Sequence, residues 1–333
     1  MFPDPEIIES LMRLGLLKDV DEAKFEALTG GVSSDIWRVE TAEKTYCVKR
    51  ALAKLKVEAD WFAPVERNRY EVAWYRIANQ FAPQSAPAIL AHDEEKMLFV
   101  MEYLDASSFK LWKNELRDGR TNSVQAARTG ETLGRVHAGA AGNTEVSVHF
   151  PSADIFHAIR LEPYLEATAE VHTDMREQLF ALSERTSKIR LTMIHGDVSP
   201  KNILMGSSGP VFLDAECACI GDPAFDLAFC LNHFLLKCLW NPAAKEGYLS
   251  SFDAMTESYK KQINWEEVGD LEARAATLLP GLFLARVDGK SPVEYLTNET
   301  DKNKVRRCAR SLLINSPKRL SDVSNSWARE LEI

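Results

Sequence analysis

One short stretch beyond the middle of the chain constrains the fold more than any other. An apolar approach leads into the polar loop 195–202, which reads HGDVSPKN, and an apolar hairpin over 203–213 then ends on Asp214. Two glycines mark the turn of that hairpin. A hairpin of this size folds Asp214 back beside Asn202, so the loop and the strand end present Asp197, Asn202 and Asp214 to one place. The stretch therefore predicts a cluster of three oxygen-bearing side chains.

These three side chains suit a magnesium-dependent phosphoryl transfer. Mg²⁺ prefers oxygen ligands at about 2.0–2.1 Å and usually shares them with phosphates and water. In phosphoryl transfer the protein positions the acceptor hydroxyl, neutralises developing charge and holds the metal. We therefore expect Asp197 to accept the hydroxyl proton or to orient the hydroxyl, and Asn202 and Asp214 to hold Mg²⁺.

The organisation along the chain changes near residue 105. An opening helix is expected after the Asp4-Pro5-Glu6 capping sequence. Alternating apolar patterns then predict strands, and one helical pattern interrupts them. The expected strands lie at 35–40, 45–50, 89–92 and 97–103, and the expected helix at 61–81. The remainder is mostly helical, and 333 residues at ~150 per domain favour two domains.

Charge and cysteine content limit the classes of function. The chain has 40 Lys and Arg against 49 Asp and Glu, a net charge of −9, which argues against nucleic-acid binding and permits a cationic small-molecule partner. None of the six cysteines forms a C-x-x-C pair, so buried free thiols are expected. No signal peptide is evident, and polar residues interrupt the most apolar stretch, 224–240. We expect a soluble, cytoplasmic protein without a membrane partner; its oligomeric state stays open.

The loop and hairpin together resemble a known family. H-G-D-x-x-x-x-N followed by an apolar strand ending in D-x-E, and the GDPAFDLA run at 221–228, resemble the small-molecule kinases of the aminoglycoside phosphotransferase and choline kinase superfamily. The resemblance implies an α+β, protein-kinase-like two-lobe fold with an antiparallel β-sheet N-lobe and a mainly helical C-lobe. It places the nucleotide-binding lobe, with its leading helix, at 1–104 and the catalytic and substrate-binding lobe at 105–333. In that family the second aspartate of the GDPAFDLA-like run opens a buried helix and braces the catalytic loop.

The same resemblance implies an ATP site in the N-terminal part. Lys49, in a C-V-K strand, takes the place of the family's phosphate-binding lysine. Glu71 is the leading candidate for its carboxylate partner and Glu66 an alternative, because a buried ammonium without a partner costs several kcal/mol. The phosphate-covering loop corresponds to the run GGVSS, with Gly30, Gly31, Ser33 and Ser34 as candidate contacts. At the hinge between the lobes, Met101 would lie beside the adenine ring, and backbone groups of Glu102 and Leu104 would meet its edge.

The resemblance implies an ATP-dependent enzyme that moves the γ-phosphate to a hydroxyl of a small molecule, with an aminoglycoside-, choline- or sugar-like acceptor. The alternative is a nucleotide-binding kinase-fold regulator without turnover. The set of Asp197, Asn202 and Asp214 favours the enzyme, since a regulator has no need of a catalytic aspartate. Candidate acceptor-lining segments are 149–157, 234–240 and 282–295. We expect His137 and His195 to be structural.

Overall fold

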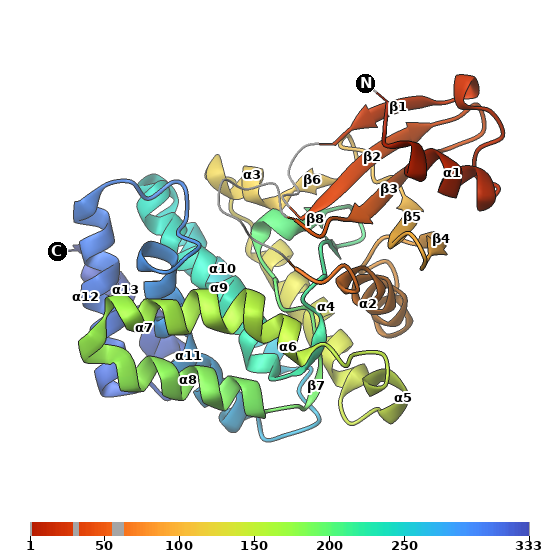
Figure 1. The fold of residues 1–333 in the computed structure, drawn as a ribbon. Helices are drawn as coiled ribbons and strands as arrows, with labels where there is room; N and C mark the ends of the chain where they lie inside the picture. Colours follow the sequence, from red (N-terminus) through yellow and green to blue (C-terminus); the bar gives the residue numbers. More distant parts are fainter. Residues whose placement is uncertain (1, 29–32, 55–62, 333) are drawn as a thin grey trace.

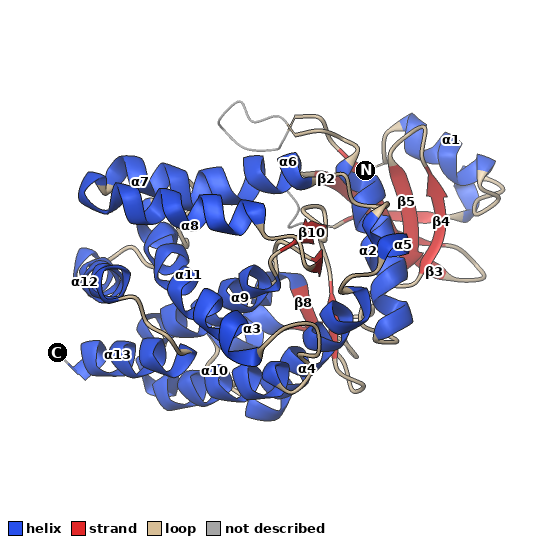
Figure 2. Ribbon diagram, turned by 90° about the horizontal axis from the view of Figure 1, so that it is seen from below, coloured by secondary structure: helices blue, strands red, loops and turns tan. Residues whose placement is uncertain are grey.

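The computed structural model describes residues 2–28, 33–54 and 63–332. A five-stranded antiparallel sheet, in the order β1-β2-β3-β5-β4, forms one end of the molecule, and the rest is mainly helical (Figures 1 and 2). The first part comprises α1 (Pro5–Arg13), η1 (Val20–Glu22), β1 (Lys24–Ala27), β2 (Ser34–Glu40), β3 (Thr45–Ala51), α2 (Arg67–Phe81), β4 (Ile89–Asp93) and β5 (Leu98–Glu102). The α+β fold with its sheet first and its helices after is therefore as expected from the sequence.

The second part is mainly helical and contains two further small sheets, β10-β7 and β6-β8-β9. Its elements are β6 (Lys110–Leu111), α3 (Trp112–Arg117), α4 (Ser123–Ala140), α5 (Thr144–Ser147), α6 (Ala153–Phe156), the π-helical η2 (His157–Glu166), α7 (Ala167–Val171), η3 (Thr173–Met175), α8 (Arg176–Lys188), β7 (Thr192–Ile194), η4 (Pro200–Asn202), β8 (Ile203–Met205), β9 (Pro210–Phe212), β10 (Cys219–Gly221), α9 (Pro223–Trp240), η5 (Pro242–Ala244), α10 (Lys245–Lys260), α11 (Val268–Asp288), α12 (Glu299–Asn315) and α13 (Leu320–Glu332).

Side-chain alternation in β3 and β5 gives the large sheet two different faces. Val48 pairs in register with Val100, and both belong to an apolar cluster with Ile7 of α1. Cys47 and Phe99 point to the opposite face and join the main core with α2. Because successive side chains on a strand alternate between faces, Lys49 lies on the same face as Cys47. The alternation thus directs the lysine toward α2 and the helical part.

The first helix begins as the sequence indicates. Asp4 caps it by accepting a hydrogen bond from the Glu6 N–H at 2.9 Å, with Pro5 at the first helical position. The second helix differs from expectation, because α2 starts at Arg67 rather than at residue 61. Residues 61–62 lie outside the described ranges, and 63–66 are not helical. Pro64 explains the late start, because it lacks an N–H and disfavours helical backbone in the residue before it.

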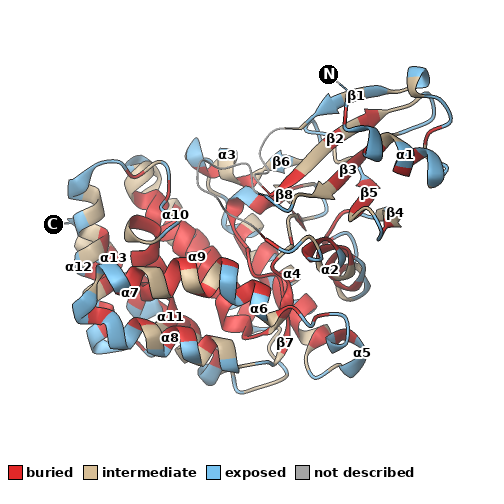
Figure 3. Ribbon diagram, viewed as in Figure 1, coloured by how far each residue is buried: buried red, intermediate tan, exposed pale blue. Residues whose placement is uncertain are grey.

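Helix α9 forms the centre of the helical part and is buried along nearly its whole length (Figure 3). Among the described residues, no helix is both long enough and apolar enough to cross a membrane. All six cysteines are free and buried, as expected from their apolar surroundings. The division of the chain at residue 104 stays a prediction.

Candidate active site

Loop 195–202 follows β7 directly, and His195 fixes its first turn. The His195 Nδ1 accepts the Asp197 N–H at 3.1 Å, and its Nε2 donates to the Leu213 carbonyl at 3.0 Å. Burial lowers the pKa of His195, so the ring is neutral with its proton on Nε2. His195 therefore ties the loop to the strand end beside Asp214, and its expected structural role is confirmed.

The GDPAFDLA run holds the same loop from the other side. The Asp226 carboxylate accepts the N–H groups of His195 at 2.6 Å and Gly196 at 2.8 Å, and it contacts the His137 Nε2 at 3.2 Å. The opening of α9 belongs instead to Asp222, which accepts the Ala224 N–H at 3.1 Å. One aspartate was expected to open the buried helix and to brace the catalytic loop. In the structure, Asp222 opens α9 and Asp226 braces the loop. His137, whose Nδ1 lies 2.8 Å from the Tyr259 hydroxyl, is structural as expected.

Asp197 is buried among cations and keeps one oxygen unpaired. Its Oδ2 accepts the Asn202 amide at 2.9 Å and forms ion pairs with Arg160 at 2.7 Å and Lys201 at 3.2 Å. Its Oδ1 is buried and has no hydrogen-bond partner among the described residues. Burial by itself raises the pKa of this carboxyl, but Arg160 and then Lys201 outweigh burial, so the pKa lies below its usual value. Asp197 is therefore ionised and has a free acceptor oxygen.

Lys49 joins the sheet to the hairpin end through two carboxylates. Its Nζ lies 2.8 Å from Glu71 Oε1 and 2.5 Å from Asp214 Oδ1. Burial lowers the pKa of Lys49, but Asp214 and then Glu71 outweigh burial and raise it, so the ammonium keeps its charge. Glu66 is exposed, which resolves the choice of partner in favour of Glu71. Tyr75 completes the group, since its hydroxyl donates to Glu71 and accepts the Asp214 N–H, each at 2.8 Å.

Asn202 and Asp214 fit the requirements of a magnesium ion that shares its ligands with phosphates. The Asn202 Nδ2 donates to Asp197, which leaves its Oδ1 as an available acceptor. Lys49 keeps the pKa of Asp214 below its usual value although burial alone would raise it, so the carboxylate is ionised. Among the described residues no group of three His, Cys, Asp or Glu could hold a metal by itself. A metal here would thus take further oxygens from nucleotide and water, as Mg²⁺ commonly does.

A cavity of about 580 Å³ brings the predicted residues together between the sheet and the helical part. It is lined by Ser33, Lys49, Met101, Glu102, Leu104, Asp197, Asn202 and Asp214 from the expected set. Glu71 and Ser34 are buried but do not line it, and Gly30 and Gly31 lie outside the described residues. The Glu102 N–H donates to the Ala88 carbonyl at 2.9 Å, so an adenine contact at Glu102 would have to use its carbonyl.

Four basic residues at this cavity were missed from the sequence: Arg67, Lys113, Arg160 and Lys201. Arg67 donates to Glu216 Oε2 at 2.9 Å, which ties α2 to the D-x-E segment. Lys201 lies within the 195–202 loop, four residues after Asp197, and that spacing could have indicated the ion pair. Arg160 comes from η2, far away in sequence, and no local pattern points to it.

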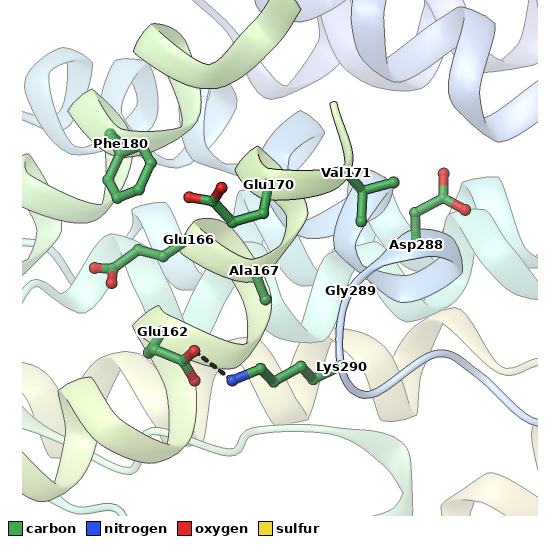
Figure 4. Close-up of a pocket in the computed structure, with 9 residues that line it drawn as sticks. All are labelled: Glu162, Glu166, Ala167, Glu170, Val171, Phe180, Asp288, Gly289 and Lys290. Carbon is green, nitrogen blue, oxygen red and sulfur yellow. Dashed lines mark hydrogen bonds and ion pairs between the residues drawn. The ribbon is translucent and has the colours of Figure 1, made fainter. Parts of the chain in front are cut away.

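A second cavity of about 550 Å³ lies between α7 and the loop at 288–290 (Figure 4). Several carboxylates line it, including Glu162 and Glu166. Each of these is already paired, Glu162 with Lys290, and Glu166 with His157 at 2.8 Å. Glu170 and Asp288 are also paired, with Arg176 and Arg306, so among the described residues the second cavity has no buried, unpaired acceptor like that of Asp197.

The fold, with Asp197 in the cavity between the sheet and the helical part, has a counterpart in a known protein family. The model of the phosphotransferase enzyme family matches residues 24–259, so the chain belongs to that family. Among curated proteins, it is 24% identical over 255 residues to methylthioribose kinase of Bacillus cereus (strain B4264). That match covers 67% of this chain and 63% of the relative, so the chain spans less than two thirds of the length of such relatives.

Solved structures show the same fold at lower sequence identity. A choline/ethanolamine kinase family protein from Mesorhizobium loti has a TM-score of 0.51 and 16% identity, covering 96% of this chain and 98% of that one. Choline kinase from Cryptosporidium parvum Iowa II has a TM-score of 0.54 and 13% identity, covering 99% and 95%. Amicoumacin kinase hAmiN, in complex with AMP-PNP, Ca²⁺ and Ami, has a TM-score of 0.54 and 13% identity, covering 94% and 95%.

Proposed function

We propose that this protein is an ATP-dependent kinase that transfers the γ-phosphate to a hydroxyl group of a small molecule. The observation that carries the proposal is the buried Asp197 carboxylate, which has an unpaired Oδ1 and lines the same cavity as Lys49 and Asp214. Family membership supports a nucleotide with a divalent cation as the phosphate donor. The AMP-PNP and Ca²⁺ in the hAmiN complex support it as well.

In this proposal the nucleotide occupies the half of the cavity next to the sheet. Lys49, held by Glu71, contacts the phosphates, while Met101 packs against the base and Glu102 and Leu104 offer backbone groups to its edge. The GGVSS run, with Gly30, Gly31, Ser33 and Ser34, covers the phosphates. Asn202 and Asp214 would hold Mg²⁺, which supplies positive charge to the phosphate oxygens.

Asp197 acts on the acceptor. Its Oδ1 accepts the hydrogen bond of the acceptor hydroxyl and orients that oxygen toward the γ-phosphorus. A bond forms between the acceptor oxygen and the γ-phosphorus, the bond from that phosphorus to the bridging oxygen breaks, and ADP leaves. The hydroxyl proton passes to Asp197 Oδ1. Because the pKa of Asp197 is low, it receives this proton late, when the hydroxyl has become acidic through bonding to phosphorus.

The first test measures ADP release from Mg-ATP with a panel of hydroxylated metabolites and aminoglycosides. We expect at least one acceptor to accelerate ADP release, and Asp197→Asn to remove that acceleration while nucleotide binding, followed by calorimetric titration, stays within a few-fold. Asn has nearly the shape of Asp but cannot accept the proton, so a fall of about 10³-fold or more is expected from loss of proton acceptance together with loss of charge.

Two outcomes would contradict the proposal. Equal turnover by wild type and Asp197→Asn would exclude Asp197 from the reaction. Tight nucleotide binding without acceptor-stimulated ADP release would support the alternative, a nucleotide-binding regulator without turnover.

A further inference from the structure

The half of the cavity formed by the helical part has three cations in its lining, beside the carboxylates Asp197, Asp214 and Glu216. Lys113 comes from α3, Arg160 from η2 and Lys201 from the 195–202 loop. Of the carboxylates among the described lining residues, only Asp197 forms ion pairs with any of these three. These three cations belong to the surface on which the acceptor must lie if Asp197 is to reach its hydroxyl.

A fourth cation, Arg286 of α11, stands directly behind this surface. Its Nη1 donates to the Tyr164 hydroxyl at 3.1 Å and the Ser291 Oγ at 3.1 Å, and both residues line the cavity. Its Nε is buried without a partner, and none of its ion-pair or hydrogen-bond partners among the described residues is a carboxylate. No carboxylate compensates the buried guanidinium by direct contact, although its charge helps to lower the pKa of Glu294.

Carboxylates do not balance these four residues, which we call the basic wall (Lys113, Arg160, Lys201 and Arg286). Asp197 faces Arg160 and Lys201 together. Glu294 pairs with Lys113 at 2.5 Å, but its side chain is 64% exposed, so water weakens that pair. Asp214 and Glu216 also line the cavity, but they form their ion pairs with Lys49 and Arg67. Among the described residues, two carboxylates therefore form ion pairs with the four cations of the wall, although the whole chain has a net charge of −9.

The nearby aromatic pair does not offer a site for a cationic acceptor. Trp240 and Tyr295 stack with their ring centroids 4.0 Å apart. The ammonium of the chain's own Lys237 lies 4.6 Å from the Trp240 ring and 4.9 Å from the Tyr295 ring. Cation–π contact with these rings is therefore already made by a buried lysine.

We propose that the acceptor carries an anionic oxygen group, a carboxylate or a phosphate, next to its reactive hydroxyl, and that the basic wall holds this group. The inference rests on the proposed function, because it names the acceptor class of the same site. Of the three cations that line the cavity, Lys113 is the one not paired with Asp197, and its own partner Glu294 is exposed to water. An acceptor with a positive charge would be repelled by the wall.

The test compares acceptors that differ only in charge. Short hydroxy acids and sugar phosphates form the anionic arms, and the amides, unphosphorylated sugars and amino alcohols with the same hydroxyl are the neutral and cationic counterparts. Binding is measured by calorimetric titration in the presence of Mg-ADP, and turnover by ADP release. We expect an anion to bind at least about tenfold more tightly than its neutral counterpart, as one charge-assisted hydrogen bond would provide.

Two substitutions move anion binding in opposite directions. Lys113→Gln should weaken it about tenfold, and Glu294→Gln should tighten it, because Lys113 loses its competing partner. A loss of local structure would not tighten binding. Lys110→Gln is the matched control: this exposed lysine bonds the Ala106 carbonyl and does not line the cavity. The binding of neutral acceptors should be the same in these three variants as in the wild type.

The inference and the proposed function can fail separately. If neutral or cationic acceptors bind more tightly than every anion, or if Lys113→Gln leaves anion binding unchanged, the inference is overturned even when ADP is formed. If anions bind through Lys113 but never accelerate ADP release, the acceptor-side inference stands and the kinase assignment fails. Preference for hydroxy acids or for sugar phosphates identifies which anionic group the wall holds.

Discussion

At the scale of single residues, Lys237 gives the clearest link between burial and pH. The side chain is buried within α9, and no carboxylate among the described residues forms an ion pair with it. Burial, then the charges of Lys113 and Arg286, lower its pKa to about 7, against an opposing effect of Glu294. In the unfolded chain a lysine titrates near 10.4.

The sign of the pH effect follows from these two pKa values. Between pH 7 and about 10.4 the unfolded chain binds more protons than the folded one, so the free energy of unfolding rises with pH in this window. We predict that Lys237→Met raises the free energy of unfolding at pH 7 and removes a pH-dependent gain of about 3 kcal/mol between pH 7 and 9.5. Methionine keeps the length of the chain and packs well on aromatic rings.

Urea denaturation of both proteins at pH 7.0 and 9.5 measures this difference. Lys110→Met, at an exposed position, is the control and should follow the wild type. If Lys237→Met shows the same rise with pH as the wild type, Lys237 is not the group that titrates.

At the scale of secondary-structure elements, α4 and α10 pack with almost no space between their backbones. A Cβ added at Gly130 of α4 would lie 2.2 Å from the Met255 carbonyl oxygen of α10. Gly269 at the start of α11 has no atom within 4 Å of that position. We predict that Gly130→Ala lowers the free energy of unfolding by about 1–3 kcal/mol, whereas Gly269→Ala raises it by about 0.5 kcal/mol through helix propensity.

Thermal and urea unfolding of the two variants provide a matched comparison, because the same atoms are added to a helix in each. Equal stability changes in the two variants would mean that α4 can shift away from α10 without cost. The Gly130 variant is also expected to retain nucleotide binding, because Gly130 does not line the cavity.

The sequence predicted the fold because its strongest signals are local. Alternation gave the strands around Lys49, and the capping sequence at Asp4 gave the first helix. The start of α2 was placed too early, since the helical pattern outweighed the effect of Pro64. The close contact at Gly130 was not predicted, because it joins two helices separated by more than 100 residues.

In the candidate site too, residues joined by a local element could be predicted, and residues brought in by long-range packing could not. Asp197, Asn202 and Asp214 were brought together correctly because one hairpin connects them, and Leu213 N–H indeed donates to the Asn202 carbonyl at 2.8 Å. Arg160 was missed because its position beside Asp197 depends on the packing of η2. The choice between Glu66 and Glu71 needed the register of α2 against β3. Their roles in binding and catalysis stay predictions.

At the scale of the whole molecule, the cavity is lined by residues of both the sheet and the helical part, so the proposed nucleotide would contact both. A ligand that binds only the folded protein stabilises it by about 2.7 kcal/mol at 100 times its Kd. Mg-ADP should therefore raise the unfolding temperature. Adding EDTA should reduce this increase, because in the proposed site Mg²⁺ joins the nucleotide phosphates to Asn202 and Asp214.

The variant Asp214→Asn distinguishes the stabilisation given by the metal from that given by the nucleotide. The variant loses the ionised carboxylate, whose Oδ1 otherwise lies 2.5 Å from Lys49. We predict that ADP with EDTA still raises its unfolding temperature, and that adding Mg²⁺ gives no further increase. Asp105→Asn, an exposed change near the hinge, should retain the wild-type response to Mg²⁺. If Mg²⁺ raises the unfolding temperature of Asp214→Asn as much as that of the wild type, the Asp214 carboxylate is dispensable for the metal, and the ion is held elsewhere.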